Sequence, residues 1–362
     1  PFVTHPMSAA IILGQIFPDA TAITATILHD ITEDTDTTDT NLKEEFSEEI
    51  AALVDGVTKL GHVRLRNSTD EYYVENLRKM FIATSKDIRV MLIKLADRLH
   101  NMRTIGALSP EKQTKIASET LEMYAPIAGR LGIGAWKDEL EDLSFKIVDP
   151  ENYEKTEHLL QERLEERQKG TKEMQKELAT ILRVEGIKFR DISGRIKRIY
   201  SLFKKLDRYD GDITKIHDKI ALRIITKSTA DCYAALGAIH KHFNPMPGRV
   251  KDFIAMPKPN GYESLHTTVF DSEGRAFEVQ IRTDLMHETA ERGIAAHWFY
   301  EETGKDDSAT PRPNKGPSWF KELHAWQEEM ASHPEEFLEG LKIDFFKDRI
   351  FVLTPKGDVK DL

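Results

Sequence analysis

The spacing of hydrophobic residues changes partway along the chain, and this change limits the folds available to it. Up to about residue 145, apolar positions recur at helical spacing, in Ala20–Leu28, in Asn76–Arg103 with a possible break near Ser85, and in Glu119–Leu131 around Pro126. Short strand-like runs follow at 219–225, 251–255, 267–270 and 276–282, with helical stretches at 229–242 and 287–300. The fold class expected is therefore multidomain, a helical part followed by an α/β part.

At roughly 150 residues per domain, a chain of 362 residues suggests two to three domains. We expect a helical domain over 1–145, linker helices over 146–190 and an α/β domain over 191–342. The charged stretch 150–182 is interpreted as a solvated linker helix. Residues 343–362 resemble the opening hairpin of a further, truncated domain.

Composition excludes several classes of protein. Lys and Arg number 51 and Asp and Glu 61, a net charge of −10, which argues against a general nucleic-acid coat. A single cysteine, Cys232, cannot form an internal disulfide and fits a reducing compartment, so a cytoplasmic location is expected. No apolar run approaches the ~20 residues of a membrane span, so no membrane partner is expected. The chain begins without Met, and we expect that its natural start is missing.

Three helical segments carry residues that can hold a metal ion: His5-Pro6, His29-Asp-Ile-Thr-Glu-Asp34, and Lys94–Thr104 with Asp97. On one helix, His29 and Glu33 would share a face, as would Asp97 and Asn101. Imidazoles with carboxylates suit Mn, Fe or Zn, and such an ion activates water at neutral pH.

Each of these residues has a plain structural alternative. Taken alone, His29 would be a satisfied, partly buried histidine, His5 a turn residue before Pro6, and Asp97 an ion-paired surface acid. Only the combination of the three segments favours a site.

A second group of residues lies on the strand-like segments. Asp218 precedes one run, and Glu278 shares a strand face with Gln280 and Arg282. Two acids on neighbouring strands can hold Mg²⁺ against phosphates, although both could simply pair with Arg223 and Arg282. Upstream, Arg183–Arg208 contains nine Lys or Arg and three acids. This stretch could be a solvated basic face, a nucleic-acid patch, or a triphosphate cradle formed by Arg195 and Lys197.

Between the two acids, a loop-rich stretch carries Arg249, Lys251 and Lys258, and Tyr262 follows Asn260-Gly261. An aromatic ring beside cations can stack on a base while the cations hold its phosphates. The alternative is a core tyrosine, but Asn-Gly marks an exposed turn.

These segments, in this order, resemble the RelA/SpoT homologue family, which makes and destroys the alarmone (p)ppGpp. The resemblance covers essentially the whole chain. The motifs that carry it are His29-Asp-x-x-Glu-Asp34, Leu95-Ala-Asp-Arg-Leu-His-Asn-Met-Arg103, Gly194-Arg-x-Lys-x-x-Tyr-Ser201, Asn260-Gly-Tyr-x-Ser-x-His266, Glu278-Val-Gln-Ile-Arg-Thr283 and Ala295-Ala-His-Trp298.

The resemblance implies that the first domain is an HD-type, Mn²⁺-dependent hydrolase that removes pyrophosphate from the 3′ position of (p)ppGpp. His5, His29, Asp30 and Asp97 would ligate the metal. Glu33 and Asp34 would handle the attacking water and its protons. The nucleotide would be held by Asn101, Arg103 and Thr104.

The second domain would be a nucleotidyltransferase-like synthetase with a mixed sheet. It would transfer pyrophosphate from ATP to the 3′-hydroxyl of GDP or GTP, leaving AMP. Asp218 and Glu278 would serve Mg²⁺ and hydroxyl activation, Arg195 and Lys197 would bind ATP, and Tyr262 would stack on guanine. The other substrate-binding residues implied are Ser201, Arg249, Lys251, Lys258, Asn260, His266 and Gln280.

Two features imply that both activities are present: the intact His29–Asp34 box, and Arg249-Val-Lys-Asp252 ahead of the guanine site. The family also has an Arg-Lys pair upstream of the first metal histidine, and residues 343–362 resemble the start of its TGS domain. This chain begins after the pair, so weaker hydrolysis is expected than from a longer chain. Ribosome and tRNA would be reached only through C-terminal domains absent from this sequence.

Two other functions stay open. One is an HD-type hydrolase of another nucleotide with an inactive second domain, against which the intact Gly194–Ser201 and Asn260–His266 motifs argue. The other is a non-catalytic RNA-binding or ribosome-binding module that uses the basic stretch 183–208, against which the net charge of −10 argues.

Overall fold

A computed structural model describes residues 3–61, 87–161, 164–194, 198–208, 220–258, 260–293 and 295, and the backbone of 351–353 and 359–361. The chain divides into two compact units, one of Pro1–His100 with Ser318–Leu362 and the other of Asn101–Pro317. This division falls earlier than the domain boundary expected near residue 145. The domain boundaries drawn from the sequence stay a prediction.

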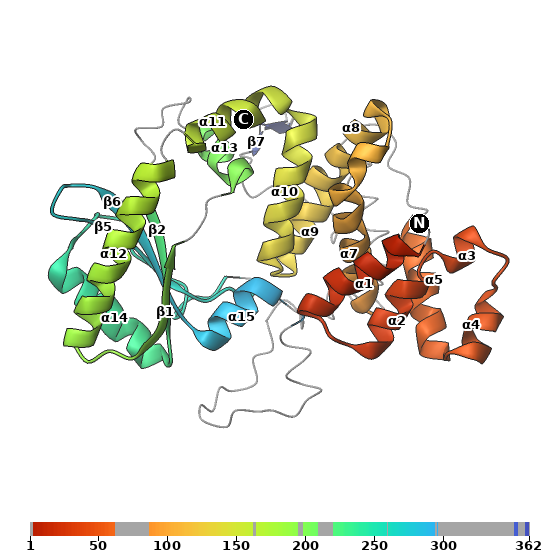
Figure 1. The fold of residues 1–362 in the computed structure, drawn as a ribbon, viewed down its shortest axis with the longest axis horizontal. Coiled ribbons are helices and arrows are strands. Elements are labelled where there is room, and N and C mark those ends of the chain that lie inside the picture. Colours follow the sequence, from red (N-terminus) through yellow and green to blue (C-terminus); the bar gives the residue numbers. More distant parts are fainter. Residues whose placement is uncertain are drawn as a thin grey trace. The chain divides into compact units, whose positions relative to one another are not determined.

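Within residues 3–100, the described part of the first unit is helical (Figure 1). Its helices are α1 (Thr4–Ile16), α2 (Ala20–Leu28), α3 (Ile31–Asp34), α4 (Asp39–Glu45), α5 (Glu48–Gly61) and α7 (Arg89–Arg103), which runs into the second unit. Leu13, Ala22, Val54 and Ile93 are fully buried and belong to its core. The helical character expected for this region is confirmed, while residues 62–86, including Ser85, lie outside the described residues.

The segment 29–34 is not one continuous helix. α2 ends at Leu28, Asp30 precedes α3, and the two residues between these helices form a turn. The premise that His29 and Glu33 share a helix face at i and i+4 is therefore wrong. The turn leaves His29 buried at the end of α2, while Glu33 and Asp34 are exposed on α3.

The helices of the second unit are η1 (Ile105–Ala107), α8 (Pro110–Glu119), the π-helix η2 (Thr120–Tyr124), α9 (Ala125–Arg130), α10 (Gly134–Val148), α11 (Pro150–Gln161), α12 (Leu164–Val184), α13 (Ile199–Arg208), α14 (Thr229–His242) and α15 (Asp284–Arg292). The interruption expected in 119–131 is confirmed. Pro126 lacks the N–H that an α-helix needs, and the π-helical turn just before α9 accommodates it.

The sheet of this unit is mixed, with strand order β1-β2-β6-β5-β3 and β4 paired to β5. The strands are β1 (Phe189–Gly194), β2 (Ile220–Thr226), β3 (Asn244–Pro245), β4 (Lys251–Asp252), β5 (Leu265–Phe270) and β6 (Ala276–Thr283). Among the described strands of this sheet, β2 and β6 are the one pair that runs in parallel. All four expected strand segments occur, although the one expected at 251–255 is only two residues long, and β1 and β3 were missed.

α12 and α14 pack against the sheet and against each other (Figure 1). Met174, Leu178 and Leu182 recur every four residues on α12 and join the core formed with Val279 and Ile281 of β6. The interpretation of 150–182 as a solvated linker is therefore wrong for α12. The many charged residues of α12 masked the spacing of its one apolar face, and this face packs against the sheet.

Near the end of the chain, Phe351–Leu353 (β7) pairs antiparallel with Val359–Asp361 (β8), so the expected terminal hairpin is confirmed. Among the described helices, none combines the length and apolar character that crossing a bilayer requires.

The core of the sheet unit gives a stability prediction. Phe277 is fully buried on β6, and its ring meets Phe243 edge to face at 5.3 Å. Phe277→Ala should lower the free energy of unfolding by about 3–5 kcal/mol, because transfer and cavity costs add. Val184→Ala, at a side chain 77% exposed on α12, should change it by less than about 0.5 kcal/mol. Urea unfolding followed by circular dichroism measures both, and equal effects would contradict this core.

Candidate active sites

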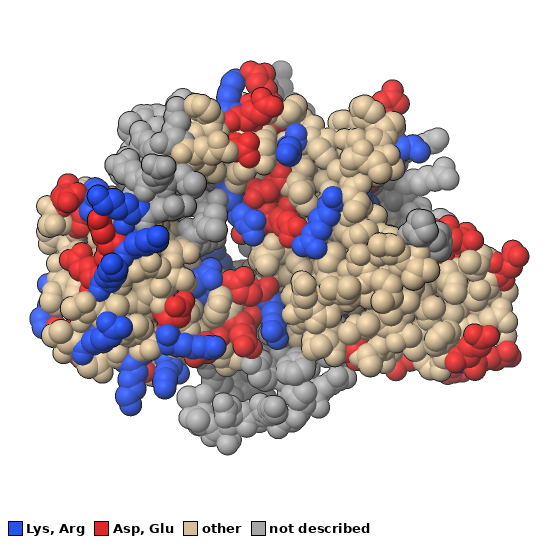
Figure 2. Space-filling model, in the orientation of Figure 1, with Lys and Arg blue, Asp and Glu red and all other residues tan. Residues whose placement is uncertain are grey.

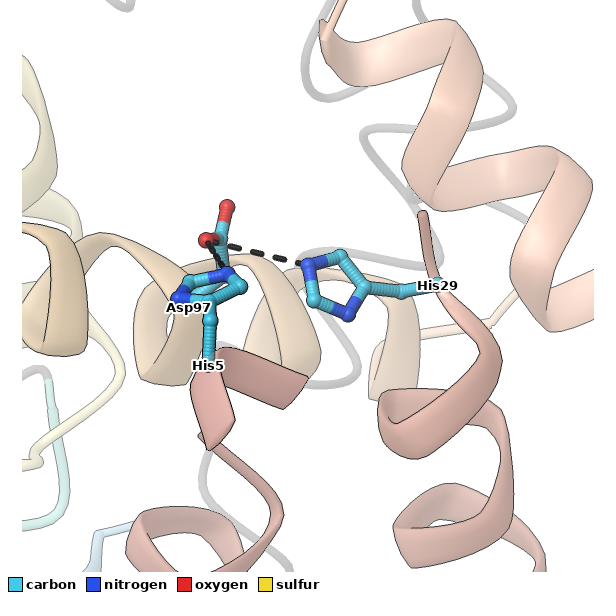
Figure 3. Close-up of side chains that lie close together, drawn as sticks. All are labelled: His5, His29 and Asp97. Carbon is cyan, nitrogen blue, oxygen red and sulfur yellow. Dashed lines mark ion pairs between the residues drawn. The ribbon is translucent and has the colours of Figure 1, made fainter. Parts of the chain in front are cut away.

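Three side chains converge on the helices of the first unit: His5 from α1, His29 from the end of α2, and Asp97 from α7 (Figure 3). Each offers one ligand atom, and these atoms all lie within 4.8 Å of one another. Asp97 Oδ1 lies 3.2 Å from His5 Nε2 and 3.8 Å from His29 Nε2. Two imidazole nitrogens and a carboxylate oxygen at this spacing can surround one divalent ion.

The ring of His29 is oriented by the backbone. Its Nδ1 lies 2.7 Å from the carbonyl oxygen of Thr26, which can only accept, so Nδ1 carries the proton. In the neutral ring, Nε2 then holds a lone pair. It is buried and makes no hydrogen bond, although Asp30 Oδ1 lies 3.1 Å away. A buried nitrogen fixed in this tautomer fits a metal ligand.

Charge around Asp97 keeps it ionised. Lys94 donates to Asp97 Oδ2 at 2.7 Å, one turn earlier on α7. Burial alone would raise the pKa of Asp97, but the Lys94 ammonium and the two imidazoles hold it well below its usual range. Burial alone would lower the pKa of His29, but its interaction with Asp97 outweighs burial, and the pKa is raised. Asp97 therefore offers a carboxylate at neutral pH.

Two further residues border this cluster. Asp30 Oδ2 lies 3.7 Å from His5 Nε2, so its carboxylate faces both histidines, and its role as fourth ligand stays a prediction. His100 was missed by the sequence analysis: its Nδ1 lies 2.7 Å from His5 Nδ1. Its helical spacing of three residues from Asp97 was the available signal.

The remaining hydrolase residues predicted from the sequence are less closely gathered. Asn101 and Arg103 lie on α7, the helix of Asp97, and Thr104 follows its end. Arg103 forms a two-pronged pair with Glu139 of α10, with Nε–Oε1 at 2.6 Å and Nη2–Oε2 at 2.9 Å. A nucleotide phosphate would have to compete with Glu139 for this guanidinium.

On the sheet of the second unit, one row of side chains crosses four strands. Lys251 of β4 is opposite His266 of β5, His266 is opposite Gln280 of β6, and Gln280 is opposite Arg223 of β2. Opposite residues project to the same face. Glu278 joins this face two residues before Gln280, whereas Phe277, Val279 and Ile281 point into the core, as the alternation predicted.

Contacts with two described residues, Gln280 and His266, tie Glu278 into this face. Gln280 Nε2 donates to Glu278 Oε1 at 3.0 Å, and His266 Nδ1 lies 3.4 Å from the same oxygen. The suggestion that Glu278 merely pairs with Arg223 and Arg282 is not what these contacts show. Both guanidinium groups reach Glu291 of α15 instead, at 3.4 and 3.0 Å.

Tyr262 reaches the same cluster from its loop. Its hydroxyl lies 2.9 Å from His266 Nε2, and its ring meets Phe253 edge to face at 6.1 Å. Lys258 Nζ lies 5.1 Å from the ring centroid. Tyr262 is partly exposed, so an approaching base could reach its ring, and Phe253 is a neighbour that the sequence analysis missed.

Of the other substrate-binding residues predicted from the sequence, some lie at the surface or partly buried, and others lie outside the described residues. Arg249 and Lys251 are exposed, and Ser201 lies partly buried on α13. Arg195, Lys197 and Asp218 lie outside the described residues, as do His297 and Trp298. On the face drawn in Figure 2, Lys and Arg around α12 and α14 are interspersed with acids, unlike a continuous nucleic-acid surface.

Comparison with known proteins agrees with this arrangement. Residues 1–134 match the HD domain family, and residues 194–305 match the region found in RelA / SpoT proteins. The chain is 46% identical to a probable guanosine-3′,5′-bis(diphosphate) 3′-pyrophosphohydrolase of Synechocystis sp., covering 100% of this chain and 48% of that protein.

Two further relatives carry the other activity in their names. A GTP pyrophosphokinase of Myxococcus xanthus is 47% identical, over 100% of this chain and 47% of the relative. The bifunctional (p)ppGpp synthase/hydrolase SpoT of Escherichia coli is 41% identical, over 100% and 51%. The chain thus spans about half the length of these relatives. The matched HD region contains the histidine–aspartate cluster, and the matched RelA / SpoT region contains Glu278 and Tyr262. The chain belongs to the RelA/SpoT family.

Proposed function

We propose that this chain catalyses two opposed reactions: transfer of pyrophosphate from ATP to the 3′-hydroxyl of GDP or GTP, and hydrolysis of (p)ppGpp to GDP or GTP and pyrophosphate. The observation that carries the proposal is the presence of two chemically different sites in two compact units. Relatives named for each activity, and one named for both, match nearly all of the chain.

The synthetase proposal rests on the polar sheet face. Glu278 would hold Mg²⁺ together with Asp218, which precedes β2. Ala221, the second residue of β2, lies beside Glu278 in the sheet. The start of β2 is therefore next to Glu278, which supports this pairing of acids. Bound Mg²⁺ would neutralise phosphate charge, since phosphoryl chemistry of this kind depends on positioning and electrostatics.

The substrates would be held by residues around Glu278. Tyr262 would stack on guanine, with Lys258, Asn260 and His266 near the base, and Gln280 would orient the Glu278 carboxylate. The cations Arg249 and Lys251 would meet the phosphates of the acceptor. ATP would be held by Arg195, Lys197 and Ser201.

The hydrolase proposal rests on the histidine–aspartate cluster. We propose Mn²⁺ as its ion, held by His5, His29, Asp30 and Asp97, and when bound it would supply Lewis acidity. Asp97 and His29 are buried, so the Asp97 carboxylate and the oriented Nε2 of His29 are shielded from solvent before an ion binds. Glu33 and Asp34 would move protons at the attacking water, and Asn101, Arg103 and Thr104 would hold the nucleotide.

The proposed organisation keeps a helical hydrolase domain at 1–145, helices at 146–190, a synthetase domain at 191–342 and the start of a TGS domain at 343–362. Nucleotides are the proposed partners, with ribosome and tRNA engaged only through further domains and no membrane partner. A cytoplasmic location is proposed from the reducing environment that a single cysteine fits.

One experiment tests the proposal against its alternatives. Thin-layer chromatography follows label from γ-labelled ATP onto GDP, and label released from 3′-labelled ppGpp with Mn²⁺. Both products are expected. Hydrolysis without any synthesis would favour a hydrolase with an inactive second domain, and neither product would favour a binding module.

The first prediction from this site concerns the acids. Asp218→Asn and Glu278→Gln should each abolish synthesis while hydrolysis continues, since loss of a metal-holding carboxylate costs on the order of several kcal/mol of transition-state stabilisation. Initial rates of both reactions in the variants and the wild-type chain measure this. An unchanged far-UV circular dichroism spectrum is the control for folding. Near-normal synthesis in both variants would remove the acids from the mechanism.

The base-binding residue gives the next prediction. Tyr262→Ala should weaken the binding of GDP and GTP by roughly 1–3 kcal/mol, because stacking needs the ring. The binding of ATP should weaken much less. Tyr262→Phe keeps the ring and loses only the hydroxyl contact with His266, so its effect should be mild. Titration calorimetry with each nucleotide measures this, and equal weakening of GDP and ATP would assign Tyr262 a structural role.

The helical cluster predicts separable activities. His29→Ala should abolish Mn²⁺ binding and hydrolysis but spare synthesis, because the histidine–aspartate cluster and Glu278 lie in different compact units. Mn²⁺ titration and both activity assays measure this. A variant that still binds Mn²⁺ with wild-type affinity would show that the ion is held elsewhere.

A further inference from the structure

Within the second unit, the turn after α9 and the end of α15 approach each other at backbone distance. A Cβ atom built on Gly293 would overlap the carbonyl oxygen of Leu131 and lie 2.6 Å from the carbonyl carbon of Gly132. A Cβ on Gly132 would lie 3.0 Å from Gly293 Cα. Both glycines have positive φ, +76° and +58°. This contact therefore requires glycine on both sides.

The same turn holds the loop that carries Tyr262. Asn260 Nδ2 donates to the carbonyl oxygen of Gly129 at 3.0 Å, and Asn260 Oδ1 accepts from the backbone N–H of Tyr262 at 3.3 Å. A Cβ on Gly132 would also lie 3.3 Å from the backbone oxygen of Asn260. The Asn260 side chain thus links the end of α9 to the backbone of Tyr262.

The loop itself is a closed turn. Gly261 N–H donates to Lys258 O at 2.9 Å, and Lys258 N–H donates to Tyr262 O at 3.2 Å. Beyond the turn, the Tyr262 hydroxyl contacts His266, which lies beside Glu278. These hydrogen bonds tie Lys258, Asn260 and Tyr262 to one another, and the bond from Asn260 to Gly129 O ties them to the end of α9.

We infer that this joint, formed by Gly132, Gly293 and Asn260, positions Tyr262 for guanine nucleotides, and that Asn260 is a positioning residue rather than a group that reads the base. The inference deepens the proposed synthetase function and rests on it for the identity of the nucleotide. In physical terms, the helices at 125–148 determine where Tyr262 lies, because their backbone contacts Gly293 and Asn260.

The decisive comparison uses two glycines with positive φ. Gly293→Ala must separate the two backbones, whereas Gly274→Ala, at φ +74° in the β5–β6 turn, meets nothing within 4 Å. Both substitutions carry the conformational cost of a side chain at positive φ, but only the first disturbs the joint. The Kd for a fluorescent GDP analogue should rise roughly tenfold or more in Gly293→Ala, since losing the stacking of a base on one aromatic ring weakens binding by about this factor.

ATP affinity should change less than GDP affinity in Gly293→Ala, and Gly274→Ala should leave both close to wild type. Equal GDP affinity in the two variants would overturn the inference. Direct binding is measured because a chain that binds GDP without transferring pyrophosphate would refute the proposed activity while leaving this comparison valid.

Asn260→Ala provides the second test and decides the question if Gly293→Ala does not fold. In nucleotide-free protein, the Tyr262 amide should exchange its hydrogen at least about tenfold faster, because its acceptor is lost. A residue that only contacts the base would leave this exchange unchanged. Unchanged exchange at Tyr262 would overturn the positioning role, whatever the effect on GDP affinity.

Discussion

The buried carboxylate of Asp97 is the group around which the helices of the first unit are arranged. A charge with 4% exposure is unfavourable unless neighbouring groups compensate it. Lys94 supplies one compensating charge from the same helix, and His5 and His29 face the carboxylate from two others. The cost of desolvating these groups is met during folding, so an arriving cation would find its ligands in place.

The sheet of the second unit divides its two faces between stability and chemistry. Alternation along β6 sends Phe277, Val279 and Ile281 into the core under α12 and α14, and sends Glu278 and Gln280 to the other face. Because cross-strand partners share a face, the strand pairing alone places His266 and Arg223 on the same face as Glu278 and Gln280. The same hydrogen-bonded register that stabilises the sheet therefore assembles the polar row.

Sequence reasoning found the polar face around Glu278 from residue types that alternate along one strand. For His5, His29 and Asp97, which have no regular spacing, it relied on the resemblance to a known family, and the structure brings these three residues together. Sequence reasoning failed where tertiary contact decides: the helix ends before His29, and α12 buries Met174, Leu178 and Leu182 beneath its charged surface. The joint at Gly132 and Gly293 joins residues 161 positions apart, and nothing local marks either glycine as one side of a contact.

Pulsed electron paramagnetic resonance of bound Mn²⁺ reports whether the oriented imidazoles and Asp97 hold one divalent ion. Imidazole nitrogens bound to Mn²⁺ modulate the electron spin echo. We expect nitrogen modulation from two histidines in the wild-type chain and from one in His5→Ala with Mn²⁺ bound. Bound Mn²⁺ without histidine nitrogen modulation in the wild-type chain would contradict this expectation.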